Sequence, residues 1–146
     1  MLKYHAGYGN VASYLTPGTP WITGSKDIGA WQETKIEFPA VTKSFTIWAS
    51  GSGTTPKIRV HFNSTSSAAT LGNDGLTHGP GAAAVDTRFH YIQLDGDEEY
   101  MNFNVRVKEV YLTALNAGSG FQLYAELTGI EASAAPIMTG SGITEE

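Results

Sequence analysis

Apolar and polar residues alternate in several short segments of this chain, and turn-forming residues separate one segment from the next. Alternation with a period of two is typical of a strand with one buried face, because successive side chains of a strand point to opposite sides. The predicted strands are residues 34–38, 43–50, 57–62, 88–94, 100–112 and 121–128. No stretch long enough for a stable helix has helical periodicity, so the pattern predicts an all-β protein.

The longest predicted strand ends at Leu112 and changes phase on the way. Its apolar residues alternate regularly as far as Val107, after which Val110 and Leu112 stand where the alternation requires polar residues. A β-bulge near Lys108 or Glu109 would return both side chains to the buried face. A long strand with one buried face is typical of an antiparallel sandwich or barrel, and we expect a β-sandwich of the jelly-roll kind.

The inward-facing side chains of these strands form the predicted core. A single domain of 146 residues buries about 68–70% of the surface of its unfolded chain, so it needs no disulfide or metal to be stable. The predicted core residues are Ile36, Phe38, Phe45, Ile47, Ile58, Val60, Phe62, Phe103, Val105, Val107, Leu123 and Leu127.

Three stretches of the chain lack a regular pattern. Residues 1–30 carry aromatic side chains on a segment broken by Gly and Pro, and they are expected to form an N-terminal arm and a first strand. The β-sandwich domain is expected to span residues 31–130, with a long loop of small residues at 64–87. Residues 131–146 form a tail of small residues. Both ends are therefore predicted to be extended arms, either disordered or ordered by a neighbouring subunit.

The composition argues against several classes of function. The net charge of −5 and the pI of about 5.3 disfavour binding to the phosphates of a nucleic acid. There is no cysteine, no apolar leader and no apolar run of the length of a membrane span. Only 16% of the residues are charged, against about 25% in a typical protein, so the surface is suited to contacts with other protein chains.

The one acidic cluster of the chain has two interpretations. It consists of Asp95, Asp97, Glu98 and Glu99. The pair Asp95-Gly96 between two strands is a strong signal for a hairpin turn. Carboxylate oxygens also bind calcium, although the spacing does not match an EF-hand loop. The hairpin is the favoured interpretation, and no metal site is predicted.

No arrangement of residues points to catalysis or to a cofactor. The four histidines do not have the spacing of metal ligands, and they are His5, His61, His78 and His90. The nucleophile motif Gly-x-Ser-x-Gly is absent, and so is a phosphate-binding loop with Gly-Lys-Ser or Gly-Lys-Thr. We therefore expect neither an enzyme nor a protein with a bound cofactor.

The three tryptophans offer an alternative of a different class. Side by side, Trp21, Trp31 and Trp48 would form a stacking platform for a carbohydrate. Trp48 alternates with Ile47 and faces away from the core with Thr46, which keeps this alternative open. Tryptophans in cores and interfaces are commoner, and that interpretation is favoured.

Five short segments resemble those of a known group of proteins. They are residues 10–21 with V-x-S-Y-x-x-x-G-x-P-aromatic, 38–43 with F-P-x-V-T-K, the paired late strands 90–94 and 99–111, and 126–130 with L-T-G-I. Together they resemble small virion structural proteins of tailed bacteriophages, especially phages of marine and cyanobacterial hosts. The resemblance spans residues 10–130, except for the loop at 64–87.

The resemblance implies a component of the capsid exterior, made in the host cytoplasm. Such a decoration or cement protein binds the outer surface of the phage head and stabilises the joints between capsomers. The implied partners are the major capsid protein and other copies of this chain, in a homo-oligomer such as a trimer, with no nucleic acid and no membrane. The alternative is a carbohydrate- or receptor-binding β-sandwich module of a head fibre or tail.

The residues expected to contact neighbouring subunits are aromatic, because aromatic side chains dominate the energetics of interfaces. They are Tyr4, Tyr8, Tyr14, Trp21 and Trp48. Tyr14 and Trp21 have a second interpretation, in which they cap the core of their own sandwich. Under either interpretation, residues 131–146 join the N-terminal arm in holding the protein to its neighbours.

Overall fold

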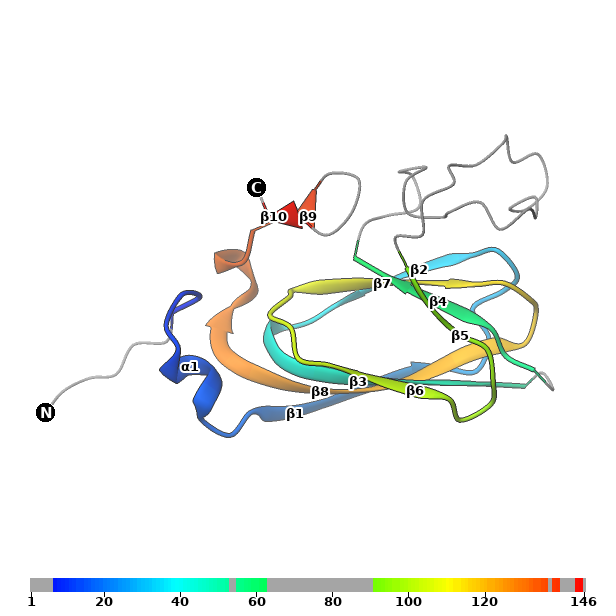
Figure 1. Cartoon of the computed structure of the whole chain (residues 1–146), viewed down its shortest axis with the longest axis horizontal. Coiled ribbons are helices and arrows are strands. Elements are labelled where there is room, and N and C mark those ends of the chain that lie inside the picture. Colours follow the sequence, from blue (N-terminus) through cyan, green and yellow to red (C-terminus); the bar gives the residue numbers. More distant parts are fainter. Residues whose placement is uncertain (1–6, 53–54, 63–90, 137, 140–143, 146) are drawn as a thin grey trace, which may run out of the picture.

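The computed structural model describes residues 7–52, 55–62, 91–136, 138–139 and 144–145 (Figure 1). Two four-stranded antiparallel sheets pack face to face, so the predicted all-β sandwich is confirmed. The loop predicted at residues 64–87 lies outside the described residues, as do the first six residues of the N-terminal arm.

Each sheet mixes strands from both halves of the chain. Sheet A has the order β1-β8-β3-β6, and sheet B has the order β2-β7-β4-β5. Sheet A contains β1 (Thr19–Ser25), β3 (Ala40–Gly51), β6 (Tyr100–Phe103) and β8 (Ser119–Glu131). Sheet B contains β2 (Glu33–Glu37), β4 (Ile58–His61), β5 (Ile92–Leu94) and β7 (Glu109–Ala114). A helical turn, α1 (Ala12–Leu15), precedes β1, and η1 (Ala132–Ala134), β9 (Met138–Thr139) and β10 (Thr144–Glu145) follow β8.

The eight strands of the sandwich pair in a nested order. β1 pairs with β8, β2 with β7, β3 with β6, and β4 with β5. The chain crosses from one sheet to the other at each connection except the one between β4 and β5. The first four strands thus pair with the last four in reverse order, and β8 lies inside sheet A between β1 and β3.

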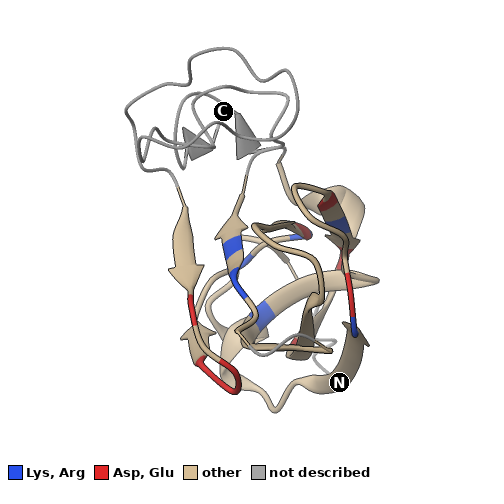
Figure 2. Ribbon diagram, turned by 90° about the vertical axis from the view of Figure 1, so that its right-hand side faces the viewer, with Lys and Arg blue, Asp and Glu red and all other residues tan. Residues whose placement is uncertain are grey.

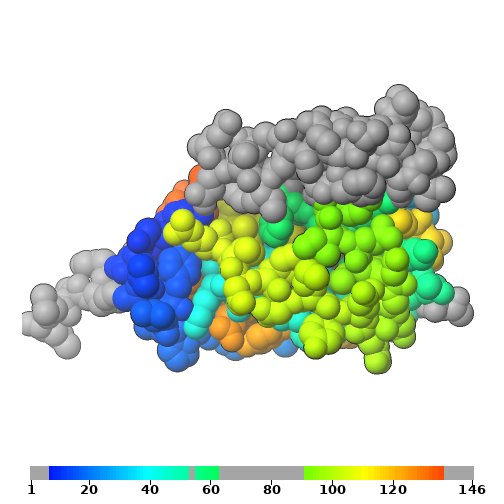
Figure 3. All heavy atoms as spheres, in the orientation of Figure 1, coloured from blue at the N-terminus to red at the C-terminus, as the bar shows by residue number. Residues whose placement is uncertain are grey.

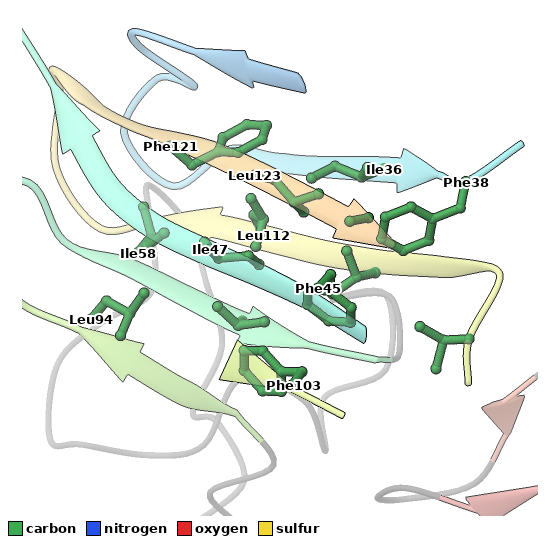
Figure 4. Close-up of a cluster of buried hydrophobic side chains, with 14 of the residues drawn as sticks. Ile36, Phe38, Phe45, Ile47, Ile58, Leu94, Phe103, Leu112, Phe121 and Leu123 are labelled. Carbon is green, nitrogen blue, oxygen red and sulfur yellow. The ribbon is translucent and has the colours of Figure 1, made fainter. Parts of the chain in front are cut away.

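The predicted core residues meet between the two sheets (Figure 4). Phe45 is 1% exposed and stacks on Phe103, with ring centroids 4.9 Å apart. Phe62 and Val105 are partly exposed, although both still pack against the buried cluster. Alternation along single strands therefore predicts which side chains face inward without any information on how the strands pair.

The prediction of one long bulged strand is wrong. β6 ends at Phe103 in sheet A, and β7 begins at Glu109 in sheet B. Residues 104–108 cross from one sheet to the other. The core lies on opposite sides of the chain before and after this crossing, so Val110 and Leu112 face inward without a bulge.

One buried threonine holds the crossing segment in place. The hydroxyl of Thr42 donates to the carbonyl oxygen of Val105 at 2.7 Å and accepts from the amide of Val107 at 3.0 Å. The backbone amide of Thr42 donates to the carbonyl oxygen of Val107, also at 3.0 Å. Thr42 is fully buried, so water cannot replace these hydrogen bonds.

The variant Thr42→Val is expected to lower the free energy of unfolding by about 1–3 kcal/mol, because the buried amide of Val107 loses its acceptor. Valine and threonine have nearly the same shape, so the loss reports the hydrogen bonds and not the packing. Urea unfolding followed by circular dichroism measures it. Thr42→Ser keeps the hydroxyl and should retain most of the stability, and an equal loss in both variants would contradict this role.

The described part of the N-terminal arm packs on the sandwich. β1 forms an edge of sheet A, where Trp21 lies opposite Ala125 of β8. Before β1, Tyr8 and Tyr14 pack against a second buried cluster, which consists of Val41, Ile130 and Ala135. In Figure 1, α1 and η1 lie at the same end of the sandwich. The described segments that precede β1 and follow β8 in the chain thus lie together at one end of the molecule.

Candidate binding surface

The side of sheet A that faces away from the core is built in rows across its four strands. Directly paired residues of antiparallel strands point to the same side, so the register defines each row. One row consists of Ile22, Tyr124, Thr46 and Asn102, and the next consists of Gly24, Gln122, Trp48 and Tyr100. We call these residues the outer face of sheet A.

The outer face of sheet A carries no charged residue. Ile22 is 74% exposed and Tyr100 is 63% exposed. Charges border the face on one side in the neighbouring row, where Oε2 of Glu126 lies 3.8 Å from Nζ of Lys43, and at the other end in the turn with Asp97 and Glu98. Most of the ribbon in Figure 2 likewise carries neither acidic nor basic residues. A partner that covers these two rows, and not the carboxylates at their end, therefore does so without the cost of removing charges from water.

A hollow of about 510 Å³ lies at one end of this face. It is lined by Trp48 and Tyr100, whose ring centroids are 6.2 Å apart, and by Gln122 beside them. Asp97 and Glu98, from the turn that precedes β6, line it as well. The hollow thus joins two aromatic rings to an amide and two carboxylates.

The acidic turn joins strands of different sheets. β5 pairs with β4 and β6 pairs with β3, so the hairpin predicted at Asp95 is wrong. The chain still turns there, because the carboxylate of Glu99 accepts from the amides of Asp95 and Gly96. The Asp-Gly pair therefore signals a turn, while the pairing of its flanking strands depends on distant residues. Among the described residues, no group of three or more His, Asp or Glu is placed to hold a metal ion.

Sheet B carries a cluster of charged residues, whereas the residues of the outer face of sheet A are uncharged. Nζ of Lys35 lies 2.8 Å from Oε1 of Glu37 and 2.8 Å from Oε2 of Glu109, and the hydroxyl of Tyr111 donates to Glu109. Hydrogen bonds to Glu109 and then to Glu37 raise the pKa of Lys35. Burial is the main cause that raises the pKa of Tyr111. Each group already has a partner, which is typical of a structural network of ion pairs.

Two polar residues of β4 are buried although they alternate with core residues. Arg59 and His61 are each 1% exposed. Nε of Arg59 donates to the amide oxygen of Gln93 at 3.1 Å, and Nε2 of His61 lies 2.8 Å from the hydroxyl of Thr113. The ring of His61 also stacks on Tyr111. Alternation predicts which side of the sheet these residues are on, but it does not predict their burial there.

Two of the predicted contact residues hold the N-terminal segment on its own sandwich. The hydroxyl of Tyr14 donates to the carbonyl oxygen of Tyr8 at 2.7 Å. The guanidinium of Arg106 lies 4.6 Å from the ring centroid of Tyr8 and donates to its carbonyl oxygen at 3.2 Å. Figure 3 shows this segment, in blue, against the crossing segment, in yellow. Tyr4, the remaining tyrosine of the prediction, lies outside the described residues.

The three tryptophans do not share one surface. Trp21 lies on the core side of β1, with its ring edge to face with Phe38 at 5.4 Å. Trp48 lies on the outer face of the same sheet, and Trp31 lies in the connection between β1 and β2. A platform of all three is therefore not formed. Trp48 keeps its outward position, with Tyr100 of β6 as its aromatic neighbour.

Comparison of the chain with protein-family models finds no match, and comparison with curated proteins finds none either. Among the described residues, no helix has the length and apolar character needed to cross a membrane. The exposed surfaces and their chemistry are therefore the basis for a functional proposal.

Proposed function

We propose that this chain is a virion structural protein, which binds the outer surface of a phage head as a decoration or cement protein and stabilises the joints between capsomers. The observation that carries the proposal is an apolar side of the N-terminal segment that faces solvent. Val11 is 71% exposed and Leu15 is 75% exposed. They are four residues apart on the turn of α1, so their side chains lie on the same side.

Contacts within the segment fix this turn, and Tyr8 and Tyr14 pack the segment against Val41, Ile130 and Ala135. Ser13 is 4% exposed, and its hydroxyl accepts from the amide of Gly7 at 3.1 Å. The side-chain oxygen of Asn10 accepts from the amide of Ala12, also at 3.1 Å. These contacts favour an arrangement that keeps the apolar side outward. Exposed apolar side chains on an ordered segment gain free energy when a neighbouring chain covers them, at little cost in ordering.

We infer that the eight strands form a jelly roll, and the nested pairing supports this inference. An eight-stranded jelly roll is one ribbon of two antiparallel halves wrapped into two sheets, and viral capsid proteins use it widely. The pairs β1–β8, β2–β7, β3–β6 and β4–β5 are those of such a ribbon. The fold is also found in lectins, so it favours binding in general more than it favours one partner.

The proposed partners are the major capsid protein and other copies of this chain, in a homo-oligomer such as a trimer on the capsid exterior. The low content of charged residues supports contacts with proteins, and the net charge of −5 disfavours nucleic acid. Capsomer joints bring several chains together, so each copy can bury surface against more than one neighbour. A standard interface buries about 1,600 Å² in total.

The double variant Val11→Ser with Leu15→Ser is expected to fold normally and to bind phage heads with about tenfold or more loss of affinity, because it removes both exposed apolar side chains. The measurement is the amount of added protein that sediments with heads of the phage that encodes this chain, after removal of the native copies. Antibody labelling of intact virions tests first whether the chain is on the head surface.

The matched control is Ile92→Ser, which removes another exposed apolar side chain from an edge strand of sheet B. It should leave the amount bound unchanged. Normal occupancy of the double variant would overturn the role of the N-terminal segment, and absence of antibody labelling from virions would overturn the proposed function.

A further inference from the structure

We propose that the hollow between Trp48 and Tyr100 is a binding site for a neutral saccharide. The hollow lies at the end of the outer face of sheet A, and none of the residues that hold the N-terminal segment on the sandwich lines it. It is therefore separate from the surface proposed to contact the capsid. The inference does not depend on that role, because the isolated chain either binds a saccharide or does not.

The aromatic part of the site comes from two strands in register. Trp48 of β3 pairs directly with Tyr100 of β6, and their rings are tilted by 34° with centroids 6.2 Å apart. Neither ring is closed off, since Tyr100 is 63% exposed and Trp48 is partly exposed. Aromatic faces carry partial negative charge and are apolar, so they attract the C–H groups on the flat side of a pyranose ring.

The polar part of the site consists of groups that have no partner within the described residues. The side chains of Asp97, Glu98 and Gln122 make no hydrogen bond or ion pair there, and neither does the hydroxyl of Tyr100. The two carboxylates only accept hydrogen bonds, whereas the amide and the phenol both donate and accept. A polyol presents several hydroxyls that do both, so its hydroxyls match this set.

The charge of the site selects the kind of saccharide. Asp97 and Glu98 place two negative charges on its border, while the described residues that line the hollow include no Lys or Arg. A sialylated or sulfated glycan would meet repulsion from these carboxylates without a compensating cation. A neutral hexose or N-acetylhexosamine unit avoids this cost, and its hydroxyls can donate to the carboxylates.

The backbone holds the acidic turn in place beside the aromatic pair. The amide of Glu98 donates to the carbonyl oxygen of Ala49 at 2.9 Å, and the amide of Ala49 donates to the backbone carbonyl oxygen of Glu99 at 2.7 Å. Glu98 adopts a φ of +63°, a left-handed conformation that few residues other than Gly take. A turn fixed in this way need not be ordered by the ligand, which favours binding.

The test uses neutral oligosaccharides as probes, namely cellohexaose, maltohexaose, xylohexaose, mannohexaose and chitohexaose, with sialyllactose and a heparin fragment as anionic comparisons. Isothermal titration calorimetry of the full chain is expected to detect at least one neutral probe at millimolar concentration, and no anionic one. Trp48→Ala and Tyr100→Ala are each expected to weaken that binding by about tenfold or more.

The matched control is Tyr124→Ala, which removes an aromatic ring from the adjoining row of the outer face and should leave binding unchanged. Trp48→Phe keeps a ring and should retain most of the affinity, and thermal melts verify that each variant folds. Failure of every neutral probe to bind overturns the proposal, as does equal binding by the Trp48→Ala variant. Loss of capsid binding in that variant, without any saccharide binding, would instead assign the hollow to a protein contact.

Discussion

Replacing Phe45 with alanine is expected to lower the free energy of unfolding by about 3–5 kcal/mol, which is a large part of the roughly 5–15 kcal/mol that a domain of this size has. Phe45 is 1% exposed and lies at the centre of an aromatic group. Its ring contacts those of Phe103, Phe38 and Phe62, with centroids 4.9, 5.6 and 6.4 Å away. Removing the ring leaves a cavity that the two sheets cannot close without shifting.

The matched control is Thr46→Ala, one residue further along the same strand. Thr46 points to the outer face of sheet A, where its hydroxyl accepts from Asn102. This variant should cost less than about 1 kcal/mol, because water can solvate the amide that loses its acceptor. Guanidinium unfolding measures both variants, and comparable losses at Phe45 and Thr46 would contradict the assignment of inward and outward sides.

The variant Gly120→Ala is expected to cost about 3 kcal/mol, at the upper end of the usual range for overpacking. A Cβ at Gly120 would lie 2.1 Å from the carbonyl oxygen of Ser25 and 2.5 Å from the carbonyl carbon of Lys26. These are backbone atoms, so no flexible side chain can move aside. Relief of the clash requires the end of β1 to separate from β8, which breaks the pairs of Ser25 with Phe121 and Gly24 with Gln122 at the end of this edge strand.

Gly9→Ala is the control for this substitution, because a Cβ at Gly9 would meet no heavy atom within 4 Å. Its melting temperature should stay close to that of the parent protein. Hydrogen exchange is expected to show faster exchange of the β1 amides in Gly120→Ala than in Gly9→Ala. Equal melting temperatures for the two variants would show that the chain accommodates the extra carbon without opening sheet A.

The inward side of each strand could be predicted because it depends only on neighbours two residues apart. Ile47 and Ile58 follow from this rule, and both are fully buried. The sheet to which a strand belongs depends on residues far away along the chain. The local pattern before Val110 predicts a bulge, but a crossing between sheets produces the same phase change, and the local pattern does not distinguish the two.

The first strand shows the same limit. Pro20 and Gly24 interrupt the pattern around Trp21, so the sequence predicts an arm and a first strand in residues 1–30 without fixing the place of that strand. In the structure it is an edge strand of sheet A, the position at which a sheet tolerates proline, because one side of an edge strand makes no ladder hydrogen bonds. Its partner, β8, lies about a hundred residues away along the chain, with Trp21 opposite Ala125.

Part of the candidate binding surface could also be predicted. The outward position of Trp48 follows from its alternation with Ile47. The proximity of Tyr100 and Gln122 to Trp48 does not follow from any local pattern, because it depends on the register of β3 with β6 and β8. The hollow can therefore be identified only from the pairing of all three strands, β3, β6 and β8.

The nested pairing has a consequence for how the protein is made. On the ribosome, β1 and β3 emerge before β8, although β8 lies between them in sheet A. Until Ser119–Glu131 is available, neither strand has that partner. Their apolar side chains and unpaired backbone groups then remain exposed to other chains. Pairing over such long separations also makes folding slow, in the range of about milliseconds to seconds. Sheet A can therefore close only after translation of β8, and unfinished chains are the species most prone to aggregate.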